Sequence, residues 1–151
     1  MKGTRVFVVM AVVALFFAEP SWAAVSLADN GNGTVTDNVT TLMWQKQDSG
    51  LTYNWDAALT YCNTLSLGGY AVGSWRLPNV KELRSLVNNT FVSPALDLNY
   101  FPLTQSYYYW SSTTYAPNTT YAWYVSFYDG SVINYYYVSN KFYVRCVRLG
   151  Q

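Results

Sequence analysis

The sequence predicts an α+β domain in which two helices pack on short antiparallel β-sheets. Three observations indicate this fold class: a hairpin pattern over residues 34–45, two segments of helical periodicity over residues 54–65 and from Asn79 onward, and short runs of β-branched and aromatic residues from Tyr107 to the end. No internal repeat is visible, so we expect one domain rather than an array of small units.

The first 23 residues have the order of a secretory signal peptide. Lys2 and Arg5 precede an apolar run over residues 6–17, and a small-x-small sequence ends at Ala23. The run of 12 residues is too short for a membrane-spanning helix, which needs roughly 20. We therefore expect cleavage of residues 1–23, no membrane span in the mature residues 24–151, and a secreted, periplasmic or cell-surface domain. An uncleaved membrane anchor is the alternative.

A β-hairpin is predicted near the start of the mature chain. Residues 34–37 and 41–45 alternate in polarity on either side of the turn Asp37-Asn38. The Asp, Asn and Gly residues of the preceding segment, 29–34, are typical of a turn. A calcium-binding loop is the alternative interpretation of that segment, but the downstream Glu ligand of an EF-hand is missing.

Two amphipathic helices follow. Apolar residues recur at helical spacing over residues 54–65, and Gly68-Gly69 supplies a stop signal. The second helix is expected to begin at Asn79, which can cap it while Glu82 reaches back to complete a capping box. Cys62 falls on the apolar face of the first helix, so its side chain is expected to be buried.

The last third of the chain is predicted to form an antiparallel sheet. Runs of β-branched and aromatic residues place strands near residues 109–112, 122–127, 131–134 and 142–148. Asp129-Gly130 stands between two of these runs and is a strong signal for a tight hairpin.

Composition and charge exclude some classes of protein. Removal of the signal peptide leaves seven basic and seven acidic residues, so we expect no nucleic-acid partner. Charged residues make up 11% of the chain and aromatic residues 19%, which favours a compact domain over a disordered one.

The inventory of reactive side chains does not predict an enzyme. The chain contains no His, so it lacks an imidazole base, the common zinc ligand sets and the usual catalytic triad. The carboxylates of the mature chain are scattered, and none pair at helical spacing for acid–base work. We therefore expect no catalytic residues, no metal and no cofactor.

The two cysteines, Cys62 and Cys146, are expected to form a disulfide, because an exported protein meets an oxidising compartment. A bridge across so long a loop stabilises the fold by roughly 4 to 5 kcal/mol in the chain-entropy model. A free catalytic thiol is the alternative, but no His is present to act as its base.

Several large side chains are expected to be structural. Arg76 lies between Trp75 and Leu77, and if it is buried it needs a carboxylate or several carbonyls as partners. A ligand contact is the alternative role for Arg76. Arg145 is expected to anchor an ion pair. Five tryptophans are predicted to pack in the core: Trp44, Trp55, Trp75, Trp110 and Trp123.

Six motifs occur in order along the mature chain: "DNGNGTVTDNVTTLMWQK", "WDAALTYCN", "WRLPNVKEL", "YWSSTTY", "AWYVSFYDGSV" and "YVRCVR". In these motifs the chain resembles the Lcl C-terminal domain family, named for a domain of a bacterial collagen-like adhesin, over residues 29–148. The resemblance implies a fold similar to C-type lectins and formylglycine-generating-enzyme-like domains. It also implies an exported bacterial protein, in some cases adhesive. Formylglycine-generating relatives use cysteine and copper chemistry, whereas both cysteines here are expected in the disulfide, so a degenerate enzyme of that type is a minor alternative.

A ligand site is predicted in the last third of the chain. Twelve of the 15 tyrosines lie between Tyr100 and Tyr143, among Asn, Ser and Thr. Neighbouring residues of a strand point to opposite faces, so each of the triplets 107–109 and 135–137 is expected to expose at least one ring. Tyr, Ser and Asn together form an adaptable binding surface. The predicted ligand-binding residues are Tyr107, Tyr108, Tyr115, Tyr121, Tyr128, Asn134, Tyr135 and Tyr137.

Two functional hypotheses follow. The first is an exported module that recognises a cell-surface glycan or protein through these tyrosines. The second is an envelope-associated structural domain whose tyrosines pack without a ligand. A narrower form of the first hypothesis makes residues 106–140 the target of a diversity-generating retroelement, because mutagenesis of Asn-type codons yields Tyr, Asn, Ser and Asp at the altered positions.

Overall fold

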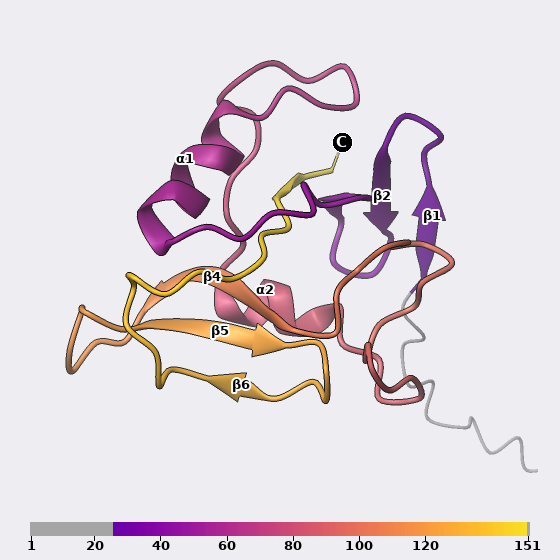
Figure 1. The fold of residues 1–151 in the computed structure, drawn as a ribbon. Coiled ribbons are helices and arrows are strands. Elements are labelled where there is room, and N and C mark those ends of the chain that lie inside the picture. Colours follow the sequence, from indigo (N-terminus) through magenta and orange to yellow (C-terminus); the bar gives the residue numbers. More distant parts are fainter. Residues whose placement is uncertain (1–25, 151) are drawn as a thin grey trace, which may run out of the picture.

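Residues 26–150 are described by the computed structural model, and they form two antiparallel sheets and two helices (Figure 1). The α+β fold class predicted from the sequence is confirmed. The predicted signal peptide, residues 1–23, lies outside the described residues. Within the described part of the chain, no helix is long and apolar enough to cross a membrane.

The first sheet contains the predicted hairpin. Its strands are β1 (Leu27–Asp29), β2 (Thr34–Asp37), β3 (Leu42–Gln45) and β7 (Val147–Leu149), hydrogen-bonded in the order β1-β2-β3-β7 and all antiparallel. The carboxylate of Asp37 holds the turn between β2 and β3, accepting hydrogen bonds from the Val39 N–H (2.9 Å) and the Thr40 hydroxyl (2.6 Å). Strand β1 was not expected, because three residues are too few to show a period.

Both predicted helices are present, and α2 begins at its predicted cap. Helix α1 spans Trp55–Thr64, and the Asn54 side chain accepts the Ala57 N–H at 2.9 Å. Helix α2 spans Val80–Ser85 and has the full capping box between Asn79 and Glu82, with hydrogen bonds of 2.9 and 2.8 Å. Such a cap stabilises a helix by about 1 kcal/mol.

The second sheet contains β4 (Tyr108–Thr114), β5 (Ala122–Ser126) and β6 (Val132–Ile133) in that order. The predicted hairpin at Asp129-Gly130 joins β5 to β6. Gly130 has a φ of +78°, and a Cβ atom there would lie 2.5 Å from the Cγ1 atom of Val87. Both the turn and the close approach of Val87 therefore require glycine at this position.

The predicted last strand, residues 142–148, is wrong in its first half, because β7 begins only at Val147. The missing part crosses between the sheets. Phe142 exchanges backbone hydrogen bonds with Tyr53 (2.8 and 3.0 Å), and the Tyr143 N–H donates to the carbonyl of Tyr108 (3.0 Å). Since its partners change from one residue to the next, this segment cannot form a regular ladder.

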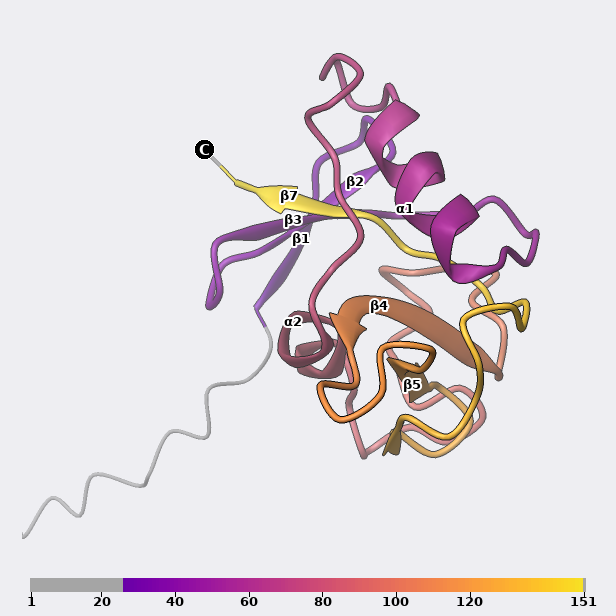
Figure 2. The ribbon, with the colours of Figure 1, turned by 90° about the vertical axis from the view of Figure 1, so that its left-hand side faces the viewer.

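The disulfide between Cys62 and Cys146 is confirmed, with Cα atoms 5.4 Å apart and a sequence separation of 84. It joins α1 to the residue just before β7, so it ties the helix to the first sheet. Figure 2 shows the first sheet projecting to one side, with α1 above the second sheet on the other.

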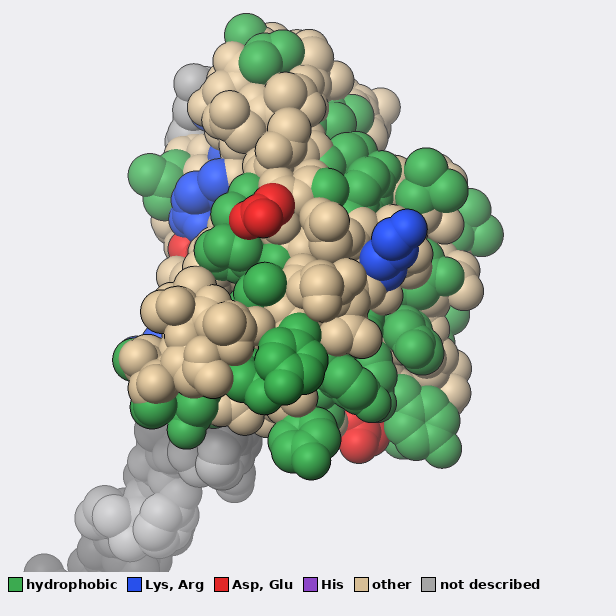
Figure 3. All heavy atoms as spheres, turned by 60° about the vertical axis from the view of Figure 1, so that its left-hand side comes forward, with side chains coloured by type: hydrophobic (Ala, Val, Ile, Leu, Met, Phe, Trp, Pro, Cys, Tyr) green, Lys and Arg blue, Asp and Glu red, His purple; other side chains and the backbone are tan. Residues whose placement is uncertain are grey.

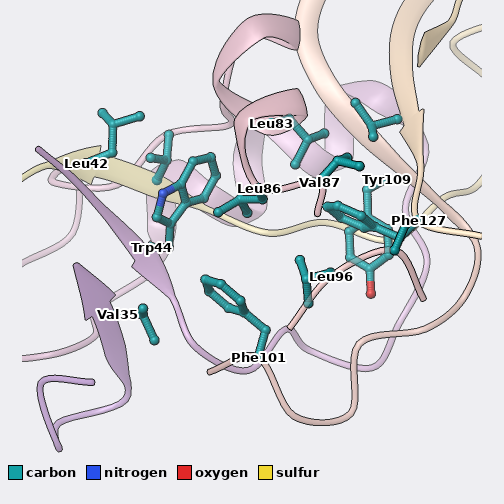
Figure 4. Close-up of a cluster of buried hydrophobic side chains, with 13 residues drawn as sticks. Val35, Leu42, Trp44, Leu83, Leu86, Val87, Leu96, Phe101, Tyr109 and Phe127 are labelled. Atoms are coloured by element: carbon teal, nitrogen blue, oxygen red, sulfur yellow. The ribbon is translucent and has the colours of Figure 1, made fainter. Parts of the chain in front are cut away.

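The core has two parts. In the first part, side chains of the first sheet, α2 and the second sheet point toward one another, among them Val35, Trp44, Leu83, Leu86 and Tyr109 (Figure 4). The second part surrounds the disulfide under α1. Of the five tryptophans predicted in the core, Trp44, Trp75 and Trp110 are buried, whereas Trp55 and Trp123 are half-buried.

Arg145 anchors a buried ion pair, as predicted. One guanidinium nitrogen donates to the carbonyls of Gln45 (2.7 Å) and Lys46 (2.6 Å), and the other faces the Asp48 carboxylate at 3.4 Å. The same carboxylate accepts the hydroxyl of Tyr109 at 2.6 Å. A buried charge needs such partners, so this network fixes the loop after β3 against the second sheet.

Candidate ligand-binding surface

The predicted ligand-binding residues gather in two neighbouring hollows. Five of them line a hollow of about 380 Å³, here called the tyrosine hollow: Tyr115, Tyr121, Asn134, Tyr135 and Tyr137. The other three, Tyr107, Tyr108 and Tyr128, line a second hollow of about 270 Å³ beside the β5–β6 turn, here called the hairpin hollow. None of the eight side chains is fully buried.

The tyrosine hollow is built where two irregular segments meet beyond the ends of β4 and β5. A turn after Tyr115 brings the chain back, so that the Tyr115 N–H donates to the carbonyl of Tyr121 at 2.9 Å. The ring of Tyr121 stacks on that of Tyr137, with centroids 4.6 Å apart. Edge-to-face contact with Trp123 at 6.1 Å supports the Tyr115 ring from below.

The hairpin hollow is held by the tight turn at Asp129. The Asp129 carboxylate accepts hydrogen bonds from the backbone N–H (3.0 Å) and hydroxyl (2.7 Å) of Ser131, which lower the pKa of Asp129 below its ordinary value. Tyr107 forms one wall, and its ring lies 4.7 Å from that of Tyr108. The carboxylate is thus already engaged within the turn.

A third hollow of about 450 Å³, here called the lysine hollow, adjoins the hairpin hollow and shares Ser106 and Tyr107 with it. Its other walls include Gln105, Lys141 and Tyr143. Sequence reasoning did not assign these residues to the site. Tyr143 lies on the segment that was expected to be a regular strand, and its partial exposure follows from the irregular path of that segment.

Sequence reasoning also missed Tyr136, which connects the hollows. Its ring lies 6.3 Å from that of Tyr135 and 5.9 Å from that of Tyr108. Figure 3 shows hydrophobic side chains, tyrosine included, gathered in a band across the lower part of one face, with few charged side chains among them. The triplet 135–137 could have suggested this role, but the position of Tyr136 in an irregular segment has no sequence signal.

The surface is close to uncharged. Of the described residues that line the three hollows, only Asp129 and Lys141 carry charge. A hydrogen bond with Tyr137 raises the pKa of Tyr121, and burial raises the pKa of Tyr124 behind the surface. The phenol groups of Tyr121 and Tyr124 therefore stay protonated at physiological pH and can both donate and accept hydrogen bonds.

Arg76 lies in a different part of the molecule. It forms a two-pronged ion pair with Glu82, at 2.7 and 2.6 Å, and so has the carboxylate partner that was predicted. Because Glu82 also caps α2, the ion pair fixes the start of the helix. Two shallow hollows, of about 440 and 250 Å³, flank Arg76 on either side of Trp75.

The acidic side chains and cysteines of residues 26–150 do not gather into a metal site. Among these residues, no group of three or more His, Cys, Asp or Glu side chains is placed to hold a metal ion. The turn at residues 29–34 engages its own polar groups: the Asp29 carboxylate accepts the Gly31 N–H (3.0 Å) and pairs with Lys46 (2.5 Å). The polar groups of this turn are thus partnered within the protein.

Fold and surface together define an α+β domain consistent with the lectin-like class, closed by one disulfide and carrying a band of tyrosines. A family model of the Lcl C-terminal domain matches residues 33–148, which is well over half of the chain. The chain belongs to this family, and the resemblance seen in its six motifs is confirmed. A search of curated proteins found no match to the chain.

Proposed function

We propose that this domain is an exported binding module with an adhesive role, which recognises a cell-surface glycan or protein through its tyrosine-rich surface. The tyrosine hollow carries the proposal: four tyrosines and Asn134 converge there on an open space of about 380 Å³. Pockets that combine aromatic walls with a few convergent polar groups are the usual form of a ligand site.

The chemistry of the lining suits a neutral, polar ligand. A tyrosine ring offers a large contact area and loses little conformational entropy on binding, and its hydroxyl supplies a hydrogen bond. The ring faces also suit stacking on sugars, while the Asn134 amide offers both a donor and an acceptor. Binding of this kind needs no metal and no catalytic group.

The alternative, a structural domain whose tyrosines only pack, fits part of the set. Tyr109 and Tyr124 are buried and complete the core. Packing does not account for Tyr128, Tyr135 and Tyr137, which are all more than half exposed. Large exposed aromatic groups gathered in one region favour an interaction site.

Export is supported by two observations that are independent of the surface. The apolar leader at residues 6–17 has the length of a signal peptide core. The disulfide between Cys62 and Cys146 fits an oxidising compartment outside the cytosol. Mass measurement of the protein recovered from culture medium, periplasm and membrane fractions tests the predicted cleavage after Ala23.

Probing a glycan array and a surface-protein array with residues 24–151 tests the proposed function. We expect at least one ligand whose signal is lost with Tyr121→Ala and Tyr137→Ala, and retained with the matched control Val72→Ala, an exposed apolar residue outside the hollows. Absence of any ligand, or a ligand unaffected by every tyrosine substitution, would support the structural alternative.

The diversification hypothesis is tested on the gene. It predicts a nearby reverse-transcriptase gene and a near-repeat of the segment that encodes residues 106–140. Altered codons in natural variants should then fall at the exposed positions of that segment, such as Tyr128, Tyr135 and Tyr137, and spare the buried Tyr109 and Tyr124.

A further inference from the structure

The three hollows are linked by shared residues and contacting rings. Ser106 and Tyr107 line both the hairpin hollow and the lysine hollow. The ring of Tyr136 contacts both Tyr135 of the tyrosine hollow and Tyr108 of the hairpin hollow.

A row of rings connects the hollows. It runs from Tyr135 through Tyr136 and Tyr108 to Tyr107, with successive centroids 6.3, 5.9 and 4.7 Å apart. Tyr135 lines the tyrosine hollow, while Tyr107 separates the hairpin hollow from the lysine hollow. Tyrosine rings thus offer contact area for a ligand both within the hollows and between them.

We propose that this surface holds a linear, uncharged glycan of several sugars, with successive sugars in the tyrosine, hairpin and lysine hollows. The inference depends on the proposed function and specifies its ligand. A chain is indicated because the hollows are open and contacting rings link them, whereas a single small ligand is normally enclosed in one pocket.

The lining indicates a neutral chain. A sulfated or phosphorylated polymer would need several cations along its path, yet Lys141 is the single cation among the described lining residues of the row. The one anion, Asp129, already bonds Ser131. The other lining groups are mainly tyrosine ring faces, Tyr and Ser hydroxyls, and the side-chain amides of Asn134 and Gln105. The ring faces can stack on the C–H faces of sugars, and the hydroxyls and amides can hydrogen-bond to the sugar hydroxyls.

A length series tests the inference. Residues 24–151 are titrated with N-acetylglucosamine, glucose and mannose oligomers, each from the single sugar up to a hexamer. For at least one series we expect affinity to rise about fivefold to tenfold with each further hollow filled, which corresponds to roughly 1 to 1.4 kcal/mol per step, and then to reach a plateau.

Two substitutions test the contributions of different hollows. Tyr137→Ala removes a ring of the tyrosine hollow, and Tyr107→Ala removes the ring shared by the hairpin and lysine hollows. Each should weaken binding of the longest oligomer at least fivefold. The shortest oligomer that binds cannot reach all the hollows, so only one of these two substitutions should weaken its binding. Val72→Ala should leave every affinity unchanged, and the unfolding midpoint of each variant shows that the domain is intact.

Failure of the extended-glycan inference can be distinguished from failure of the proposed function. Equal affinity for a short and a long oligomer, or binding confined to sulfated polymers, would overturn the extended neutral glycan and leave a tyrosine-dependent ligand site in place. Binding of a surface protein through the same tyrosines, with none of the neutral oligomers bound, would have the same result. Loss of all tyrosine dependence would instead overturn the proposed function.

Discussion

The two tyrosine triplets differ in what they contribute to the molecule. In the triplet 107–109, the rings divide between core and surface: Tyr109, within β4, is 0% exposed, and Tyr107, just before β4, is 48% exposed. In the triplet 135–137, which follows β6 in an irregular segment, the three exposed fractions are 80%, 38% and 54%. Identical side chains thus complete the core at one site and line the candidate ligand surface at the other.

The cause of the difference is the backbone. Tyr109 lies in β4, where pairing with β5 holds its ring in the core against Phe127 and beside the buried carboxylate of Asp48. Residues 135–137 follow the end of β6, and consecutive rings there face solvent together. The account therefore predicts that substitutions in the scaffold change stability, whereas substitutions on the surface change binding.

The largest effect is expected at Tyr109. Tyr109→Ala removes a fully buried ring and leaves Asp48 without one of its donors, so it should lower the free energy of unfolding by about 3 to 5 kcal/mol. The matched change Tyr135→Ala, at the most exposed ring of the other triplet, should stay within about 0.5 kcal/mol. Urea denaturation of both variants measures this contrast, and equal losses would contradict the division into core and surface.

The disulfide should have the next largest effect. Replacing Cys62 and Cys146 together by Ser is expected to lower the free energy of unfolding by about 2 to 5 kcal/mol, because the unfolded chain then loses a cross-link across 84 residues. Denaturation of the wild type with and without reductant gives an independent comparison. Two free thiols in the mass spectrum of the native protein would show that the bridge does not form.

A smaller effect is expected at the cap of α2. Asn79→Ala removes the acceptor for the Glu82 N–H and should cost roughly 0.5 to 2 kcal/mol. Asn63→Ala, at an exposed position within α1, is the matched control and should change stability little. Because α2 belongs to the scaffold, ligand affinity should stay unchanged at temperatures where the variant is folded. An unaltered unfolding midpoint for Asn79→Ala would show that the cap contributes nothing.

The parts of the fold that were predictable are those governed by local chemistry. The cap at Asn79 and the turn at Asp129-Gly130 each satisfy nearby backbone groups, so short sequence signals suffice. Residues 142–146 were mispredicted because their backbone partners lie in two different sheets and nothing in the local pattern reports that. The choice of Asp48 as partner of Arg145 was equally unpredictable, since the two are far apart in the sequence.

The sequence was sufficient to predict which segment holds the candidate site, but not all of the residues that line it. Composition identified the tyrosines between residues 107 and 137, and alternation implied that some rings are exposed. Composition could not show that Tyr136 links the hollows, or that Gln105 and Tyr143 line the third. Those contacts depend on how irregular segments cross, which only the folded chain determines.

The most direct test of the account is the salt dependence of binding, measured by titration of the strongest array ligand at low and high ionic strength. Because the lining is almost uncharged, we predict that affinity changes little with salt. It should fall when Tyr121 or Tyr137 is changed to Ala, by a factor that corresponds to more than about 1 kcal/mol each, and should persist with Lys141→Ala. Steep weakening by salt, with loss on Lys141→Ala or Arg148→Ala and indifference to every tyrosine from Tyr107 to Tyr137, would contradict the central claim that the tyrosine-rich surface is the ligand site.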